Sequence, residues 1–352
     1  MPTAAPSPPK PSPSSSSSSQ SPPSPPYRHW PHAPSTHAEG LGRLALLTPA
    51  VVASAASSQI RCGRRVGLNW EMMKLECAAF GRQKASHRIV GLFGGGLKGE
   101  EGEGEGEGGE GTVAFDDVYE FNPQQSSQWD GLRHFSQPGD ATRGEDPKRR
   151  FFYGGTTAGE IMDRGCERIG MQHWAAEGIA GRGVLIDYAA YAAKRGIQYS
   201  AFSPHAIKLA DIRAVAAECG VVFEQGDVLF VRVGVMAEWE GMGREQKEAF
   251  GANEAPTFAG VEGTVDVLGW LWDTGFAAVA GDSVSWEVFP AKDILLHEYL
   301  LAGWGMPIGE MFDLEALAAT CRELGRWTFF VASMPLNMPG GVSSPPNAMA
   351  IF

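Results

Sequence analysis

The residues best suited to chemistry lie in one polar segment, 124–135, which reads Gln-Gln-Ser-Ser-Gln-Trp-Asp-Gly-Leu-Arg-His-Phe. Gln128, Asp130 and His134 are separated by even numbers of residues, so an extended chain would direct all three side chains to one side. An aspartate and a histidine brought together in this way can share a metal ion or form a general acid/base pair. The alternative is a polar loop in which Asp130 and His134 only hydrogen-bond to the backbone.

Two further candidates lie far downstream. His297 is in the middle of a predicted helix, beside Leu296 and Leu300, and Glu310 follows thirteen residues later in the apolar stretch Gly-Met-Pro-Ile-Gly-Glu-Met-Phe. A carboxylate buried in such surroundings is costly unless a metal ion or a basic side chain accompanies it. The alternatives are a core histidine with satisfied hydrogen bonds and a solvated glutamate in a loop.

His173 and Arg182 have less specific surroundings. His173 could bring a third imidazole to the same site, or it could have a structural role ahead of the strand that follows it. Arg182 could bind a substrate carboxylate through its guanidinium group.

Alternating helices and strands must position these residues, and this alternation is typical of an α/β fold. Helices are predicted at 209–219 and 265–274, which Gly220 and Gly275 follow, and others after capping residues Thr48, Asp293 and Asp313. Strands are predicted at 65–70, 183–188, 227–234, 276–280, 327–332 and 348–352.

Two compositionally biased stretches fall outside this pattern. Residues 1–26 contain ten Pro and ten Ser, and we expect a disordered tail over residues 1–40. Residues 94–111 contain ten Gly and six Glu, which predicts an exposed loop insertion whose deletion leaves the fold intact. The remaining chain, 41–352, is expected to form a single domain.

The net charge and the cysteine content exclude several kinds of partner and site. The net charge of −12, from 29 basic and 41 acidic residues, argues against nucleic acid and anionic membranes as partners and favours a small molecule. Five scattered cysteines without a Cys-x-x-Cys pair argue against a disulfide framework and a thiolate zinc site. No secretory signal and no membrane-spanning apolar run is recognised, so the cytoplasm is the expected location.

From about residue 41 to the end, the chain resembles the cyclase family, which includes bacterial kynurenine formamidase and isatin hydrolase. The family signature is His-x-Gly-Thr-His-x-Asp-x-Pro-x-His, followed downstream by a His and a Glu about a dozen residues apart. Asp130 and His134 fall on the Asp and the last His of this signature, and His297 and Glu310 match the downstream pair. The segments 226–234 and 339–346 also match. The resemblance implies a compact fold of the swivelling β/β/α type, a homodimer and a role in tryptophan catabolism.

The chain departs from the signature where the family has its first two histidines. Gln124 and Gln128 stand there, Ser126-Ser127 replaces Gly-Thr, and Leu132 replaces Pro, as in a divergent, largely fungal-type branch. An amide oxygen is a weaker zinc ligand than an imidazole, so a two-metal site is not expected. The resemblance instead implies one divalent ion, Zn²⁺ or Mn²⁺ with Mg²⁺ also suited, held by Asp130, His297 and Glu310.

The leading hypothesis is a metal-dependent hydrolase, and the resemblance implies a small amide of the arylformamide or lactam type as its substrate. His134 would act as general acid/base, and Trp129, Phe135, Gln128 and Arg182 are the candidates for substrate contacts. For Trp129 and Phe135 the alternative is packing in the hydrophobic core. The second hypothesis is a catalytically silent binding or assembly protein that has lost two metal-binding histidines. A third keeps the enzyme but changes its reaction to cyclisation or lactone opening.

Overall fold

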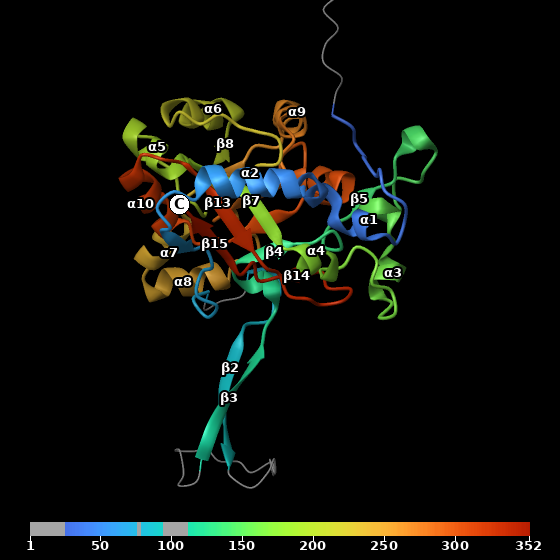
Figure 1. Cartoon of the computed structure of the whole chain (residues 1–352), viewed down its shortest axis with the longest axis horizontal. Helices are drawn as coiled ribbons and strands as arrows, with labels where there is room; N and C mark the ends of the chain where they lie inside the picture. The colour runs from blue at the N-terminus through green and yellow to red at the C-terminus, as the bar shows by residue number, and fades with distance from the viewer. Residues whose placement is uncertain (1–24, 76–78, 94–111) are drawn as a thin grey trace, which may run out of the picture.

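The computed structural model describes residues 25–75, 79–93 and 112–352, and these form one mixed α/β domain around a curled nine-stranded sheet (Figure 1). The strand order is β1-β15-β13-β7-β9-β11-β12-β4-β14, and the four strands β7, β9, β11 and β12 run parallel to one another. The remaining strands are antiparallel to their neighbours. The strands of this sheet are β1 (Arg65–Gly67), β4 (Gln128–Asp130), β7 (Ile179–Asp187), β9 (Val228–Arg232), β11 (Ala278–Gly281), β12 (Ile308–Glu310), β13 (Thr328–Ser333), β14 (Ser343–Ser344) and β15 (Ala348–Ile351).

Helices and short two-stranded ribbons surround this sheet. The helices are α1 (His37–Leu41), α2 (Pro49–Gln59), α3 (Ala158–Met162), α4 (Gln172–Glu177), α5 (Tyr188–Arg195), α6 (Leu209–Glu218), α7 (Val235–Gly241), α8 (Arg244–Gly251), α9 (Val265–Thr274) and α10 (Glu315–Leu324). The ribbon strands are β2 (Ser86–Phe93), β3 (Thr112–Glu120), β5 (Gln137–Pro138), β6 (Arg150–Phe151), β8 (Ala206–Ile207) and β10 (Gly260–Val261).

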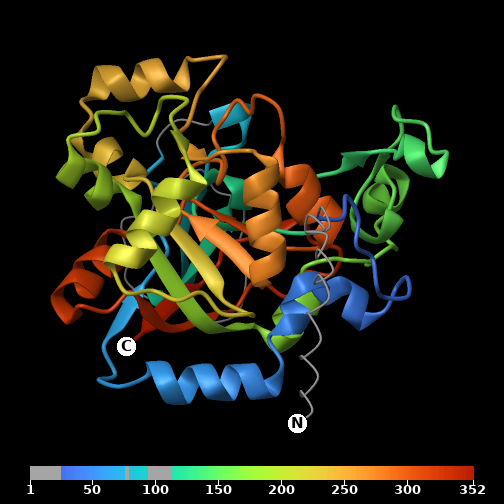
Figure 2. The same cartoon turned by 90° about the horizontal axis from the view of Figure 1, so that it is seen from above.

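Alternation along the central strands builds two hydrophobic cores. Leu229 and Val231 of β9 pack in one core with residues of α6 and α9, whereas Val228 and Phe230 pack in the other with residues of α10. Successive side chains of a strand point to opposite faces, so a continuous apolar run must be covered on both sides. Figures 1 and 2 show α2 crossing the sheet at β7 and β13, away from α6 and α9.

Several helix boundaries predicted from the sequence are confirmed. Helix α9 has the predicted bounds, with Gly275 in the left-handed conformation after it, and the Thr48 hydroxyl accepts a hydrogen bond from Val51 N at the start of α2. The predicted helix beginning at Asp293 was wrong in its start, because helical structure begins at Leu296 and continues as a π-helix over Glu298–Gly303. The backbone N–H groups of Leu296 and His297, at the start of this helix, donate to the carboxylate of Glu287, which takes the place of a capping residue next to the helix.

The expected tail was wrong for residues 25–40, while residues 1–24 lie outside the described residues. Arg28 is buried and forms an ion pair with Glu145 at 2.5 Å, and Trp30 Nε1 donates to Ala302 O at 2.8 Å. Aromatic and basic side chains in Tyr-Arg-His-Trp, residues 27–30, supply these contacts, so folded structure begins about sixteen residues earlier than composition indicated.

The stretch His37–Gln59 meets the length and hydropathy criteria for a membrane span, which the sequence analysis did not expect, with a mean hydropathy of 1.3. In the fold this stretch is divided between α1, the 3₁₀ turn Gly42–Leu46 and α2, and α2 packs on β7 and β13. Length and composition alone are weak evidence for a membrane helix at such a place.

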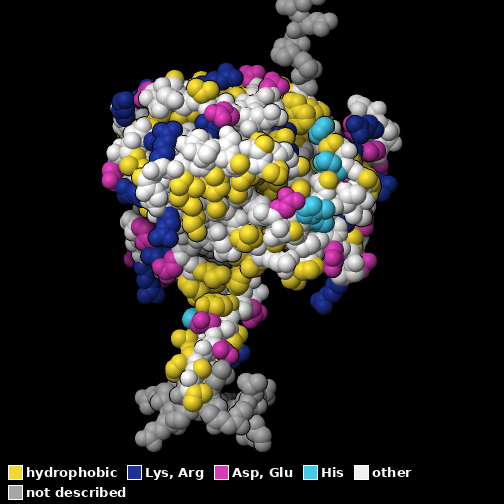
Figure 3. Space-filling view, in the orientation of Figure 1, with side chains coloured by type: hydrophobic (Ala, Val, Ile, Leu, Met, Phe, Trp, Pro, Cys, Tyr) yellow, Lys and Arg dark blue, Asp and Glu magenta, His cyan; other side chains and the backbone are white. Residues whose placement is uncertain are grey.

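The hairpin of β2 and β3 projects from the body of the domain (Figures 1 and 3). The Gly/Glu-rich run 94–111, predicted as a loop insertion, falls between these two strands and lies outside the described residues. On the hairpin, Ile89 and Phe115 are each 64% exposed.

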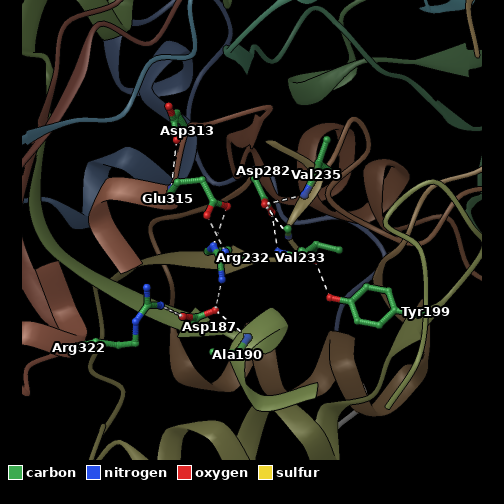
Figure 4. Close-up of polar contacts among 11 residues, drawn as sticks. Asp187, Ala190, Tyr199, Arg232, Val233, Val235, Asp282, Asp313, Glu315 and Arg322 are labelled. Atoms are coloured by element: carbon green, nitrogen blue, oxygen red, sulfur yellow. Dashed lines mark hydrogen bonds and ion pairs between the residues drawn. The ribbon is translucent and has the colours of Figure 1, made fainter. Parts of the chain in front are cut away.

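Polar residues at the carboxyl ends of β7 and β9 are engaged in a structural network (Figure 4). Arg232 donates to Asp187 at 2.7 Å and to both carboxylate oxygens of Glu315 at 2.9 and 2.7 Å. Just beyond β11, Asp282 accepts the backbone N–H groups of residues 233–235 at the start of α7. Strand β12 also ends on a carboxylate, Glu310, but this side chain lies outside the network and contacts Gln128 and His297.

Candidate metal centre

Three buried side chains converge at the end of β12. Ligand atoms of Asp130, His297 and Glu310 all lie within 4.8 Å of one another, so the cluster could hold a metal ion. His297 Nε2 is 3.3 Å from Glu310 Oε1 and 4.0 Å from Asp130 Oδ2. The three residues that the family resemblance placed at the metal are therefore brought together by the fold.

Strand pairing positions the two carboxylates. β4 and β12 are antiparallel, with Glu310 opposite Gln128 and Ile308 opposite Asp130, so Gln128, Asp130 and Glu310 share one face of the sheet. Gly309 allows close packing there, because a Cβ atom at this position would lie 2.7 Å from Ala280 Cβ and 2.9 Å from the Trp129 ring.

The chain turns sharply after Glu310. Met311 adopts a φ of 52°, a left-handed conformation that is unfavourable for a residue with a side chain. Two hydrogen bonds hold it, from Met311 N to Ser283 O at 3.0 Å and from Ser127 Oγ to Met311 O at 2.6 Å. The carboxylate of Glu310 is thus fixed between a strand and a restrained turn.

Glu287 orients the imidazole of His297. Its carboxylate accepts His297 Nδ1–H at 2.5 Å, His297 N–H at 2.9 Å and Leu296 N–H at 2.5 Å. Since Nδ1 carries the proton in this arrangement, Nε2 faces Asp130 and Glu310 with its lone pair when the ring is neutral. A carboxylate that fixes a histidine in this way is typical of metal sites.

The buried carboxylates of this site favour the binding of a cation. Asp130 is fully buried, and within residues 25–75, 79–93 and 112–352 its Oδ2 atom has no hydrogen-bond partner. Burial and the neighbouring Asp130 charge raise the pKa of Glu310 to about 7, although His297 lowers it. Burial lowers the pKa of His297, but hydrogen bonds to Glu287 and Glu310 outweigh burial and raise it well above its usual value. A buried carboxylate oxygen that accepts no hydrogen bond from the described residues and lies beside a second carboxylate fits a divalent cation.

His134 lies at the edge of this cluster. Its Nε2 atom is 3.6 Å from Asp130 Oδ2, and its Nδ1 atom is 2.7 Å from Gln124 Nε2. Burial is the main cause that lowers the pKa of His134, so the ring is neutral at pH 7. The side chain retains 20% exposure, more than the side chains of Asp130, His297 and Glu310.

Gln128 and Phe135 both contact the cluster. Gln128 is fully buried, and its Nε2 donates to Glu310 Oε2 at 2.8 Å and to Asp130 Oδ1 at 3.5 Å, so it orients the carboxylates. The Phe135 ring is 5.3 Å from the His297 ring and is partly exposed. Of the predicted substrate contacts, Phe135 is the one whose position suits that role.

The structure contradicts the predicted roles of Trp129 and Arg182. Trp129 is completely buried on the opposite face of β4, where Nε1 donates to Ser333 Oγ at 2.9 Å, because it alternates with Gln128 and Asp130. Arg182 is bound to both oxygens of Asp227 at 2.8 and 2.7 Å, at the amino-terminal edge of β9. Neither side chain faces the cluster.

His173 does not supply a third imidazole. Its Nδ1 atom is 3.2 Å from His37 Nδ1 on the surface, so the alternative of an added ligand is wrong.

Sequence reasoning missed Glu287 and the role of Gln124. Glu287 stands in the apolar run Trp-Glu-Val-Phe ten residues before His297, and this is the same signal that singled out Glu310. Gln124 was treated only as a lost ligand, whereas its amide binds His134.

The fold and the site define an α/β protein with a buried Asp–His–Glu cluster at a strand end. The family model described as putative cyclase matches residues 29–288, and the chain belongs to this family. A crystal structure of a novel cyclase is 25% identical, with a TM-score of 0.71, covering 89% of this chain and 96% of that one. No curated protein matches the chain closely enough in sequence to count as a relative.

Isatin hydrolases share the fold. Isatin hydrolase A from Ralstonia solanacearum is 14% identical with a TM-score of 0.54, covering 86% of this chain and 97% of that one. An isatin hydrolase bound to the product analogue thioisatinate is 12% identical with a TM-score of 0.54, covering 85% and 95%. The cyclase fold predicted from the sequence is therefore confirmed.

Proposed function

We propose that this protein is a metal-dependent hydrolase of a small amide, with one divalent ion held by Asp130, His297 and Glu310. The observation that carries the proposal is the buried Asp130 Oδ2 atom, which lacks a hydrogen-bond partner among the described residues and adjoins a second carboxylate and an oriented imidazole. A bound divalent ion supplies Lewis acidity and lowers the pKa of a coordinated water toward neutrality.

His134 is the residue placed to move protons at this site. With Gln124 Nε2–H donating to Nδ1, the proton of neutral His134 sits on Nε2, which suits donation to a leaving nitrogen. Rotating the Gln124 amide by half a turn presents its oxygen to Nδ1–H and leaves the Nε2 lone pair to accept a proton from water. Gln124 therefore supports either tautomer, and His134 can serve as general base and then as general acid.

Phe135 supports an aromatic substrate. Its ring lies against His297 and is partly exposed, so it offers a flat apolar surface beside the reacting groups. An isatin hydrolase of the same fold binds thioisatinate, the analogue of its product. We propose that the substrate is an arylformamide or an aromatic lactam and that a C–N bond is hydrolysed.

Metal analysis combined with hydrolysis assays tests this proposal. After depletion and reconstitution with Mn²⁺ or Zn²⁺, we expect the buried site to retain one ion and to hydrolyse N-formylkynurenine or isatin. The Asp130→Asn variant should lose that ion and keep its fold. Asp227 is a buried aspartate outside the cluster, so the Asp227→Asn variant should keep the ion. Full metal retention in Asp130→Asn would show that the site lies elsewhere.

One observation favours a catalytically silent protein instead. The Gln128 amide donates to Glu310 and therefore occupies a carboxylate oxygen that a metal could use. In that case the reconstituted chain retains less than stoichiometric metal at the buried site and shows no turnover on either substrate.

A further inference from the structure

Helices α1 and α4 hold a pair of histidines on the surface, away from the buried cluster. Trp174 Nε1 donates to Gly40 O at 2.9 Å, and the Trp174 side chain is buried. Gly40 packs against the His173 ring so closely that a Cβ atom at this position would lie 2.1 Å from His173 Cγ. The two short helices are therefore fixed relative to each other.

The two imidazoles face each other across this contact. His37 Nδ1 is 3.2 Å from His173 Nδ1, with ring centroids 5.4 Å apart. On the far side of the His37 ring, Nε2 is 2.7 Å from Glu177 Oε1. When Nε2–H donates to Glu177, the Nδ1 lone pair of neutral His37 points toward His173.

We propose that His37 and His173 form a second metal site, which binds a divalent transition-metal ion through their two Nδ1 atoms. Two nitrogens that each lie ~2.05 Å from a tetrahedral ion are roughly 3.3 Å apart, close to the separation observed here. Glu177 would then orient His37 as outer carboxylates orient metal-bound histidines. Water completes the coordination, since His37 is 46% exposed.

The donor set defines the class of ion. Imidazole suits Zn²⁺, Ni²⁺ and Cu²⁺, and the Irving–Williams order places Cu²⁺ as the tightest of the three, whereas Mg²⁺ and Ca²⁺ prefer oxygen ligands. Burial lowers the pKa of His173, and the neighbouring His37 imidazole lowers it further, which keeps the Nδ1 lone pair available at pH 7. Histidines gather on this side of the molecule, beside acidic side chains, in Figure 3.

The hairpin provides a matched control. His87 Nε2 is 2.6 Å from Asp117 Oδ1, and the two side chains are 36% and 54% exposed, which resembles the pairing of His37 with Glu177. The described ring partner of His87 is Tyr119, not a second imidazole. His87→Ala therefore removes an exposed histidine–carboxylate pair without removing a two-histidine site.

Calorimetric titration of the full-length chain with Zn²⁺ at pH 7.5 tests the proposal. Performing it in the Asp130→Asn background, beside the chain with Asp130 intact, separates the surface site from the buried cluster. We expect one ion bound in that background, with affinity falling at least 10-fold in His37→Ala and in His173→Ala and about 10-fold in Glu177→Gln. His87→Ala should leave the affinity unchanged.

Zn²⁺ should also raise the unfolding temperature of the Asp130→Asn chain, because the ion links α1 to α4, and this increase should disappear in His37→Ala. His37 and His173 both lie at the surface, so folded protein is expected for His37→Ala and for His173→Ala. Equal Zn²⁺ affinity in His37→Ala, His173→Ala and His87→Ala would overturn the proposal and leave a simple hydrogen bond between the two rings. Loss of affinity in only one of the two histidine variants would also overturn it.

Discussion

Glu287→Gln isolates the contribution of an orienting carboxylate to the proposed buried metal site. The side chain is 1% exposed and accepts three hydrogen bonds, with Oε1 serving both His297 N–H and His297 Nδ1–H and Oε2 serving Leu296 N–H. Glutamine has nearly the same shape but carries one oxygen and no charge. Its best arrangement keeps the oxygen toward His297 and turns the NH₂ group against Leu296 N–H.

The size of the effect follows from these contacts. Two charge-assisted hydrogen bonds become neutral ones, at about 1 kcal/mol each, and one buried N–H group loses its acceptor, at about 1–3 kcal/mol. We therefore expect the free energy of unfolding to fall by about 3–5 kcal/mol. Because outer-shell partners typically change metal affinity by about 10–100-fold, the metal Kd should rise by that factor.

Urea denaturation of the metal-free variant and metal titration of the folded variant measure the two effects separately. Glu262→Gln is the control, since Glu262 Oε1 also accepts a backbone N–H, from Leu209 at 2.9 Å, but lies outside the cluster. It should lose some stability and keep its metal affinity. If Glu287→Gln destabilised the fold but changed metal affinity less than threefold, Glu287 would be a helix cap alone, and the argument for an oriented His297 would fail.

Three further predictions concern the same site. Burial raises the pKa of Glu310 to about 7, so protonated Glu310 should stabilise the metal-free fold below about pH 4.5. This contribution, on the order of 3 kcal/mol, should be lost as pH rises through 7. In urea denaturation across pH, Glu310→Gln should abolish the dependence, and an unchanged pH profile in that variant would contradict the assignment. Gln128→His places an imidazole opposite Glu310 and should tighten metal binding about 10-fold by calorimetry, and weaker binding would mean that the Gln128 amide is needed to hold the carboxylates. Trp129→Phe should lower the free energy of unfolding by about 1–3 kcal/mol and leave KM unchanged. Phe135→Ala should raise KM about 10-fold with little loss of stability. The reverse pattern in steady-state kinetics and denaturation would exchange the roles of the two residues.

Local signals predicted the secondary structure well where the chain itself supplies the caps. Thr48 begins α2 and Gly275 follows α9, and both act within a few residues along the chain. The helix carrying His297 was misplaced because its cap, Glu287, comes from a separate segment. A capping residue that approaches from elsewhere in the fold leaves no local pattern beside the helix start.

In the candidate site, too, the local pattern of the sequence predicts some features and the fold decides others. Parity within the segment 124–135 predicts Gln128, Asp130 and His134 on one side of an extended chain. Strand β4 confirms this for Gln128 and Asp130 and places Trp129 in the opposite core, whereas His134 lies in the turn that follows the strand. For Trp129, the residue type alone allows both stacking on a substrate and packing in the core, and burial in the fold decides for packing in the core.

The sequence by itself determined the α/β class and the acidic character of the chain, because these depend on composition and periodicity. With the family resemblance, motif order also selected the candidate residues Asp130, His134, His297 and Glu310. The tertiary structure decided what each residue faces. Because β12 pairs with β4, Glu310 lies beside Asp130, and the fold also places Glu287 next to His297. Arg182 instead binds Asp227, and His173 contacts His37. Such contacts join residues separated by ten to nearly two hundred positions, and their energies depend on burial and partner geometry, which arise only when the chain folds.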